Sequence, residues 1–192
     1  SVFLQNPFHI FNDEADFEVQ CDSKEYYRIP NTVMPVPWQV NLGFYKVHPT
    51  KNVMKFMPFW LKRMYDASKV HDQSSLRKVL KPYETYWINN DTVIVNTTTL
   101  LGSDYPNLTF RFLDPMLITN AGGLYQEGAK DWKNEAKLRN LERPEFIHFF
   151  HIGRTGEKRD TITQNDLWFI DKQKLKCLNK KPKGAIDFIA WK

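Results

Sequence analysis

The stretch that decides the fold is Val40-Asn41-Leu42-Gly43-Phe44-Tyr45-Lys46-Val47, followed by a helix-like segment and then by His71-Asp72-Gln73. β-branched and aromatic residues run through Val40–His48, which predicts a strand. In Lys51–Met64, apolar residues recur at helical spacing behind Thr50, so this segment predicts an amphipathic helix with a threonine N-cap. The apolar positions of that helix are Val53, Phe56, Met57 and Trp60.

Strand-like and helix-like segments alternate along the rest of the chain. The other strand candidates are Val2–Leu4, Asp16–Cys21, Thr92–Asn96, Leu108–Leu113 and Phe146–His151. The other helix candidates are Ser74–Leu80, Asp131–Arg139 and Thr161–Trp168. Pro58 predicts a kink in the first helix, because its ring removes an internal backbone hydrogen bond. The alternation favours an α/β fold with one layered core.

The composition is that of a globular chain long enough to bury one sizeable core, with 192 residues of which 42% are hydrophobic and 26% charged. The formal net charge is +5, but the basic residues are scattered except in the tail Lys172–Lys183. No helix-turn-helix, zinc-finger or RNP-type pattern accompanies them, so we expect no nucleic-acid partner. A modest positive charge equally suits a diphosphate ligand.

Two cysteines and three glycosylation sequons bear on the cellular compartment. Cys21 and Cys177 either form one long-range disulfide or remain two buried thiols, and the sequence leaves both alternatives open. The sequons begin at Asn90, Asn96 and Asn107, within one turn-rich segment. Their clustering suits an exposed luminal surface, and we expect a protein of the Golgi lumen or a secreted one.

Three segments carry candidate chemistry. Gly43 lets the strand backbone approach a ligand closely. Asp72 and Gln73 lie at the start of a predicted helix, and they either cap this helix or contact a ligand. Their spacing alone favours the capping role. The pair Gly122-Gly123 is either a turn or room for a substrate.

The third segment is His148-Phe149-Phe150-His151-Ile152-Gly153-Arg154-Thr155-Gly156-Glu157-Lys158. A β-like run there ends in histidines and passes into a glycine-bearing loop with cations, which offers a metal ligand and groups that can face phosphate oxygens. His148 and His151 point to opposite faces if both lie on a strand, so at most one serves the same site.

Taken together, these segments resemble the nucleotide-diphospho-sugar transferases, retaining α-glycosyltransferases with a GT-A fold. Asn41-x-Gly43-Phe44, then a helix, then Asp72-Gln73 is similar to the family's central signature. The opening Val2-Phe3-Leu4-Gln5-Asn6-Pro7 is similar to the strand after the family's Asp-x-Asp motif. His148, Lys158 and Leu167-Trp168 are similar to its C-terminal ending. The resemblance implies a mixed sheet flanked by helices over 1–170, with 171–192 as a basic extension.

The resemblance also implies a role for each matching residue. His148 would complete the coordination of Mn²⁺ or Mg²⁺ on the donor diphosphate, and Lys158 would stabilise the charge of the departing nucleoside diphosphate. Asn41 and Gly43 would line the sugar. Gly122 and Gly123 stay substrate-binding candidates on the local glycine pair alone. Asp72 and Gln73 would be catalytic, because an oxocarbenium-like sugar is stabilised by a nearby carboxylate or amide oxygen.

The expected activity is transfer of a sugar, from a donor such as a UDP-sugar, to a glycan or glycoprotein acceptor with retention. The Asp-x-Asp motif and the nucleotide-binding units would lie before Ser1, and Asp13-Glu14-Ala15-Asp16 is no substitute for them. Two alternatives therefore stand: part of an active transferase, or a non-catalytic secreted carbohydrate-binding or structural relative. In both, a partner chain or an N-terminal segment would cover the sheet edge at Ser1.

Overall fold

The structure is a computed structural model that describes residues 2–3, 6–21, 39–66, 71–105, 107–120, 129–141, 144–148 and 155–164. It divides into two compact units. One comprises Phe8–Pro115, and the other combines Ser1–Pro7 with Met116–Lys192. Among the described residues, no helix has both the length and the apolar character needed to cross a membrane.

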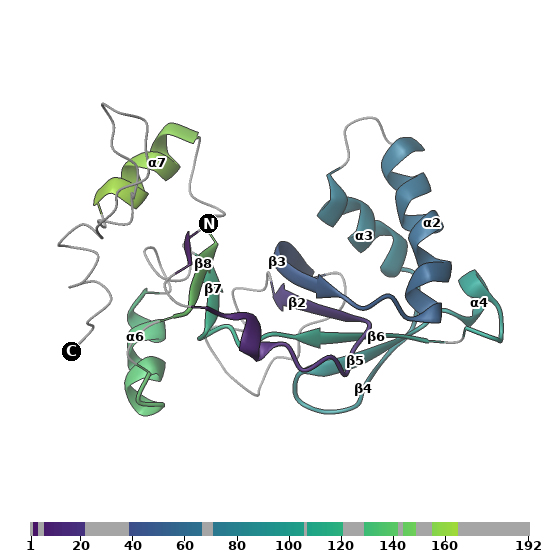
Figure 1. Cartoon of the computed structure of the whole chain (residues 1–192), viewed down its shortest axis with the longest axis horizontal. Coiled ribbons are helices and arrows are strands. Elements are labelled where there is room, and N and C mark those ends of the chain that lie inside the picture. Colours follow the sequence, from purple (N-terminus) through teal and green to yellow (C-terminus); the bar gives the residue numbers. More distant parts are fainter. Residues whose placement is uncertain are drawn as a thin grey trace. The chain divides into compact units, whose positions relative to one another are not determined.

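The unit Phe8–Pro115 is built on a five-stranded mixed sheet with the strand order β3-β2-β6-β5-β4 (Figure 1). Its strands are β2 (Phe17–Cys21), β3 (Val40–Val47), β4 (Thr85–Trp87), β5 (Thr92–Asn96) and β6 (Asn107–Phe112). Strands β2 and β6 are parallel, and the other neighbours are antiparallel. Its helices are η1 (Phe8–Ile10), α2 (Lys51–Asp66), α3 (Asp72–Leu80) and α4 (Thr98–Leu101).

The second unit holds a three-stranded sheet of order β1-β8-β7. Its strands are β1 (Val2–Phe3), β7 (Ile118–Asn120) and β8 (Phe146–His148), with β8 antiparallel to β1 and parallel to β7. Helices α6 (Ala129–Leu138) and α7 (Thr155–Gln164) complete it. The predicted α/β fold, a mixed sheet flanked by helices, is confirmed.

The core of the larger unit lies between the sheet and helices α2 and α3, which cover one sheet face (Figure 1). Burial alternates residue by residue along β5 and β6, as expected for strands with a single apolar face. Phe17 of β2 stacks on Phe110 of β6 at 4.6 Å between ring centroids and meets Phe56 and Trp60 of α2 edge-on. These aromatic contacts fix α2 on the sheet.

Helix α2 begins as its sequence predicts. The side-chain oxygen of Thr50 accepts a hydrogen bond from the backbone N–H of Val53 at 3.2 Å, which confirms the threonine N-cap. The same hydroxyl donates to the buried carboxylate of Asp16, which also accepts from the backbone N–H of Thr109. Asp16 therefore ties the start of α2 to β6. The helix continues through Pro58 to Asp66.

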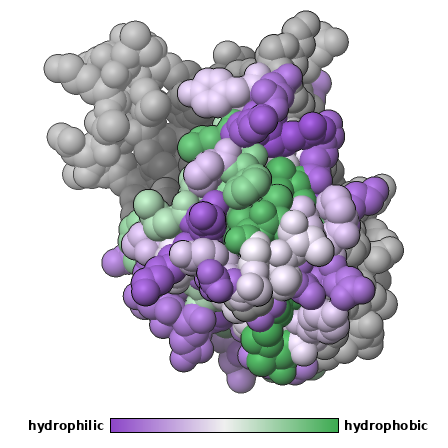
Figure 2. Space-filling model, turned by 90° about the vertical axis from the view of Figure 1, so that its right-hand side faces the viewer, coloured by the Kyte–Doolittle hydropathy of each residue, from purple (hydrophilic) through white to green (hydrophobic). Residues whose placement is uncertain are grey.

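Helix α2 has apolar residues outside its core-facing stripe as well. Figure 2 shows hydrophobic side chains reaching the surface between hydrophilic ones, on the side of the molecule where α2 and α4 lie. The exposed large apolar residues of α2 are Met54, Phe59, Leu61 and Tyr65. More of this helix is apolar than the core alone requires.

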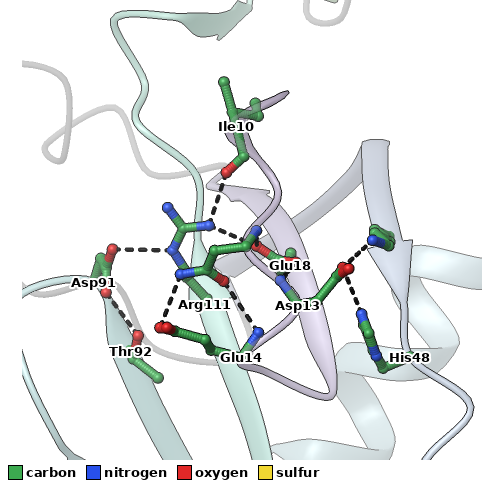
Figure 3. A network of polar contacts seen from close by, with 10 residues as sticks. Ile10, Asp13, Glu14, Glu18, His48, Asp91, Thr92 and Arg111 are labelled. Atoms are coloured by element: carbon green, nitrogen blue, oxygen red, sulfur yellow. Dashed lines mark hydrogen bonds and ion pairs between the residues drawn. The ribbon is translucent and has the colours of Figure 1, made fainter. Parts of the chain in front are cut away.

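The segment Phe8–Asp13 lies against the other face of the sheet, where it surrounds a buried carboxylate (Figure 3). Glu18 of β2 has no exposed surface, and it accepts backbone N–H hydrogen bonds from Asn12 and Asp13, each at 3.1 Å. Arg111 of β6 forms an ion pair with Glu18 at 2.5 Å and donates to the carbonyl of Ile10 at 2.9 Å. The buried charge thus has an opposite charge and three hydrogen bonds.

Two sequence expectations on this fold were wrong in detail. Helix α7 spans Thr155–Gln164, whereas the sequence predicted a glycine-bearing loop there and a helix over Thr161–Trp168. Gly156 weakens helix propensity but does not prevent a helix in a folded context. Strands β4 and β7, of three residues each, were not predicted, because their register with neighbouring strands defines them.

Removing the Arg111 guanidinium tests the buried pair. Arg111→Met leaves the Glu18 carboxylate buried without its counter-charge, so we expect the free energy of unfolding to fall by about 3–5 kcal/mol. Lys46→Met is the matched control, because it breaks an exposed ion pair with Asp13 in the same unit. Urea unfolding of both variants measures the difference, and equal losses would contradict the importance of the buried pair.

Candidate active site

The predicted sugar-binding segment of β3 lies in a large bulge. Asn41 pairs with Gln20 of β2, but the next pair along the ladder joins Tyr45 with Val19. Three residues of β3, Leu42, Gly43 and Phe44, thus lie between two consecutive partners on β2. A bulge removes backbone groups from the ladder and leaves them to bind other partners, and bulges are frequent beside active sites.

Helix α3 provides the partners for this bulge. Gln73 accepts a hydrogen bond from the backbone N–H of Leu42 through Oε1 at 2.9 Å. One turn further on, Arg77 donates from Nε at 3.0 Å and from Nη2 at 2.7 Å to the carbonyl of Val40. Two side chains of one helix face therefore hold the backbone on both sides of Asn41. We name this set of contacts, between Gln73 or Arg77 and the β3 backbone, the α3 clamp.

Asn41 stabilises the bulge from within. Its Oδ1 accepts the backbone N–H of Gly43 at 2.7 Å, and the residue has no exposed surface. A short hydrogen bond of this kind is an Asx turn, which fixes the backbone of the next two residues. Asn41 thus shapes the segment in which Gly43 lies.

Asp72 lies at the start of α3, with its side chain exposed. Its Oδ1 accepts the backbone N–H of Gln73 at 2.7 Å, and its carbonyl accepts the indole N–H of Trp60 at 3.1 Å. The residue in the N-cap position is His71, which makes no side-chain capping bond. A carboxylate at this position is stabilised by the positive end of the helix dipole.

The structure therefore brings four of the predicted site residues together: Asn41, Gly43, Asp72 and Gln73. His148 and Lys158 belong to the other unit. His148 is the half-buried last residue of β8, opposite Asn120 of β7, and Lys158 lies half-buried in α7 rather than in a loop. Gly122, Gly123, His151 and Cys177 lie outside the described residues, whereas Cys21 is buried in the core.

The three sequon asparagines lie in different surroundings. Asn90 is exposed in the turn between β4 and β5. Asn96 and Asn107 are half-buried and face each other directly in the β5–β6 ladder. The Oδ1 of Asn96 accepts the backbone N–H of Thr98 at 3.1 Å. Asn90 is therefore the most exposed of the three sequon asparagines.

One cluster in the described residues has the composition of a metal site. Ligand atoms of Asp13, Glu18 and His48 lie within 4.8 Å of one another. Both carboxylates already have partners within the protein, however. Lys46 contacts Asp13, and Figure 3 shows His48 beside Asp13 and Arg111 beside Glu18. We assign this cluster a structural role, in which it holds the turn at Asp13, where φ is 65°. The sequence did not indicate this cluster, because His48 is distant along the chain from Asp13 and Glu18.

The ion pairs of Asp13 predict a pH dependence. Hydrogen bonds from Lys46 and His48 lower the pKa of Asp13 below its ordinary value of 3.8. A lowered pKa in the folded state contributes stability above the unfolded pKa, and this stability is lost as the pH falls through the folded pKa. We expect Asp13→Asn to be less stable than the native chain at pH 7, with the difference shrinking as the pH falls below the ordinary pKa of 3.8.

Urea unfolding midpoints at several pH values check this, with Asp104→Asn as the control because Asp104 is also exposed in the same unit. A difference between Asp13→Asn and the native chain that persists in acid would show that the ion pairs are not its source.

A protein-family model covers most of the chain. The family model of the nucleotide-diphospho-sugar transferases matches residues 1–162 of the 192-residue chain. No curated protein and no solved structure gives a significant match. The match spans both units and includes the β3 bulge, the start of α3 and His148, and the mixed sheet flanked by helices is consistent with a GT-A-like domain. The chain belongs to the nucleotide-diphospho-sugar transferase family.

Proposed function

We propose that this chain forms the sugar-binding side of a retaining glycosyltransferase, which moves a sugar from a UDP-sugar to a glycan or protein acceptor. The observation that carries the proposal is the hydrogen bond between Leu42 and Gln73. It joins two motifs that lie 31 residues apart, in a family whose donor is a nucleotide-diphospho-sugar. A bulge fixed by a helix gives the rigid backbone that binding of a small polar ligand requires.

The chemistry of the proposed site follows from the charges that develop during transfer. As the bond between the sugar and the diphosphate breaks, positive charge forms on the sugar and negative charge on the leaving group. The exposed carboxylate of Asp72 is suited to stabilise the positive charge. Lys158 is the proposed partner of the departing diphosphate.

His148 is the proposed ligand of a divalent metal, Mn²⁺ or Mg²⁺, which would stabilise charge on the diphosphate. A histidine ring at the end of a strand is an ordinary metal ligand, but it is a single one. Among the described residues, the one group of three candidate ligands that lie close together does not include His148. The sequence holds no Asp-x-Asp pair, so we propose that the remaining ligands come from outside this sequence.

The compartment is proposed on the same basis. The three sequons and the UDP-sugar donor are consistent with the Golgi lumen or with secretion, and the exposed turn at Asn90 is the proposed glycan attachment site.

Calorimetric titration with UDP, with and without Mn²⁺, tests the proposal. We expect Mn²⁺-dependent binding that His148→Ala weakens by at least about tenfold, because the variant lacks a metal ligand. His9→Ala is the matched control, since His9 is an exposed histidine of the other unit.

Equal affinities in the native chain and His148→Ala would remove His148 from the site. Absence of UDP binding, together with binding to free glycans, would favour a non-catalytic carbohydrate-binding relative.

A further inference from the structure

Helix α2 carries a second apolar row besides the buried one that packs on the sheet. This row is exposed, with relative exposures of 62% for Met54, 44% for Leu61 and 84% for Tyr65. Pro58, which lies between them, is exposed as well. The four residues are separated by four, three and four positions, so they line one side of the helix over about three turns. We name this row the α2 stripe.

The α2 stripe has the spacing of a coiled-coil seam. In a heptad written abcdefg, Met54 and Leu61 occupy d positions, and Pro58 and Tyr65 occupy a positions. Phe59, another exposed apolar residue of α2, occupies a b position and lies on a different side of the helix. A seam of a and d residues is narrower than the face with which a helix packs on a protein core. It is complementary to one other helix.

Lysines border the α2 stripe on one side. Lys55 and Lys62 are exposed and occupy the e positions, each directly after a d residue. The ammonium group of Lys55 lies 5.6 Å from the ring centroid of Tyr105, in a contact that keeps its positive charge. On the other side, the g positions hold Met57 and Met64, which are half-buried. The stripe is therefore an apolar row with a cationic border.

The bordering charges determine which partner fits the α2 stripe. Residues at e positions face the e or g positions of a partner helix, and opposite charges there fix the choice of partner. A second copy of this chain offers only lysines or methionines at these positions, and neither forms an ion pair with a lysine. An amphipathic segment that lies on a phospholipid surface presents a broad apolar face, whereas the stripe is a single row. A helix with glutamate or aspartate at these positions complements both the row and its border.

We propose that the α2 stripe is the docking surface for an acidic amphipathic helix of a partner protein. The partner helix packs its apolar side chains between the residues of the stripe, as knobs fit into holes. Its carboxylates pair with Lys55 and Lys62, which gives the contact its selectivity. The inference does not depend on the proposed function, because the stripe includes none of the predicted site residues.

Two synthetic helical peptides test the inference on the full chain. Both carry leucine at every a and d position, and they differ at e and g, where the acidic peptide has glutamate and the basic peptide has lysine. Like charges at these positions keep each peptide from pairing with itself. Fluorescence anisotropy of the labelled peptides measures their affinity for the chain. We expect the native chain to bind the acidic peptide at least about tenfold more tightly than the basic one.

Variants of α2 locate the contact. Leu61→Asp and Tyr65→Asp each place a charge in the stripe, and we expect each to weaken binding of the acidic peptide by at least about tenfold. Both residues are exposed, so the urea midpoints should stay close to native. Ile88→Asp is the matched control, because Ile88 is an exposed apolar residue outside α2. Lys55→Glu combined with Lys62→Glu should reverse the preference and favour the basic peptide.

Four outcomes would overturn the inference. The native chain binds both peptides equally, or neither, if the lysines do not select an acidic helix. Leu61→Asp retains the native affinity if the peptide binds elsewhere. Vesicles of phosphatidylcholine and phosphatidylserine bind the native chain but not Leu61→Asp, without competition from the acidic peptide, if the stripe contacts a membrane. Sedimentation velocity shows a dimer that Leu61→Asp dissociates if the stripe joins two copies of the chain.

Discussion

The buried carboxylate of Glu18 determines which groups lie on the polar face of the main sheet. Glu18 is the second residue of β2, which pairs with both β3 and β6, and its carboxylate has no exposed surface. An uncompensated charge there would cost several kcal/mol, so the fold must bring donors to it. Arg111 comes from the neighbouring strand, and two backbone N–H groups come from the segment before β2. These contacts hold the segment Phe8–Asp13 on one face of the sheet. Helices α2 and α3 cover the opposite face.

The packing of the helices on one face of the sheet also determines where the candidate site lies. Because α2 and α3 pack on the apolar face, the start of α3 lies beside β3, one of the two edge strands of the described sheet. An edge strand has one neighbour, so a bulge in it costs the hydrogen bonds of one ladder only. The α3 clamp replaces part of what the bulge loses, with Gln73 as acceptor and Arg77 as donor. A distorted backbone that would be unfavourable alone thus becomes a rigid feature of the fold.

Sequence reasoning found the elements whose pattern is local. Thr92–Asn96 alternates buried and half-buried residues, as its β-branched sequence predicts, and Thr50 caps α2 as expected. It did not find what depends on partners distant along the chain. Arg77 is one of three charged residues of α3, and its sequence position predicts a solvated side chain, whereas the structure shows its contact with Val40. The motif residues Asn41 and Gln73 were identified through a family resemblance, whereas the hydrogen bonds that join their segments follow only from the tertiary fold.

Contacts with the bulge also orient the two amide side chains of the motifs. An amide oxygen has two lone pairs, so one hydrogen bond fixes its direction and leaves the second lone pair. In this site Oδ1 of Asn41 binds Gly43 and Oε1 of Gln73 binds Leu42, so both amide oxygens serve the backbone. Asp72 has two carboxylate oxygens, and one of them accepts the N–H of Gln73. Asn41 and Gln73 therefore shape the bulge, and Asp72 is the one charged side chain among the four predicted site residues that lie together.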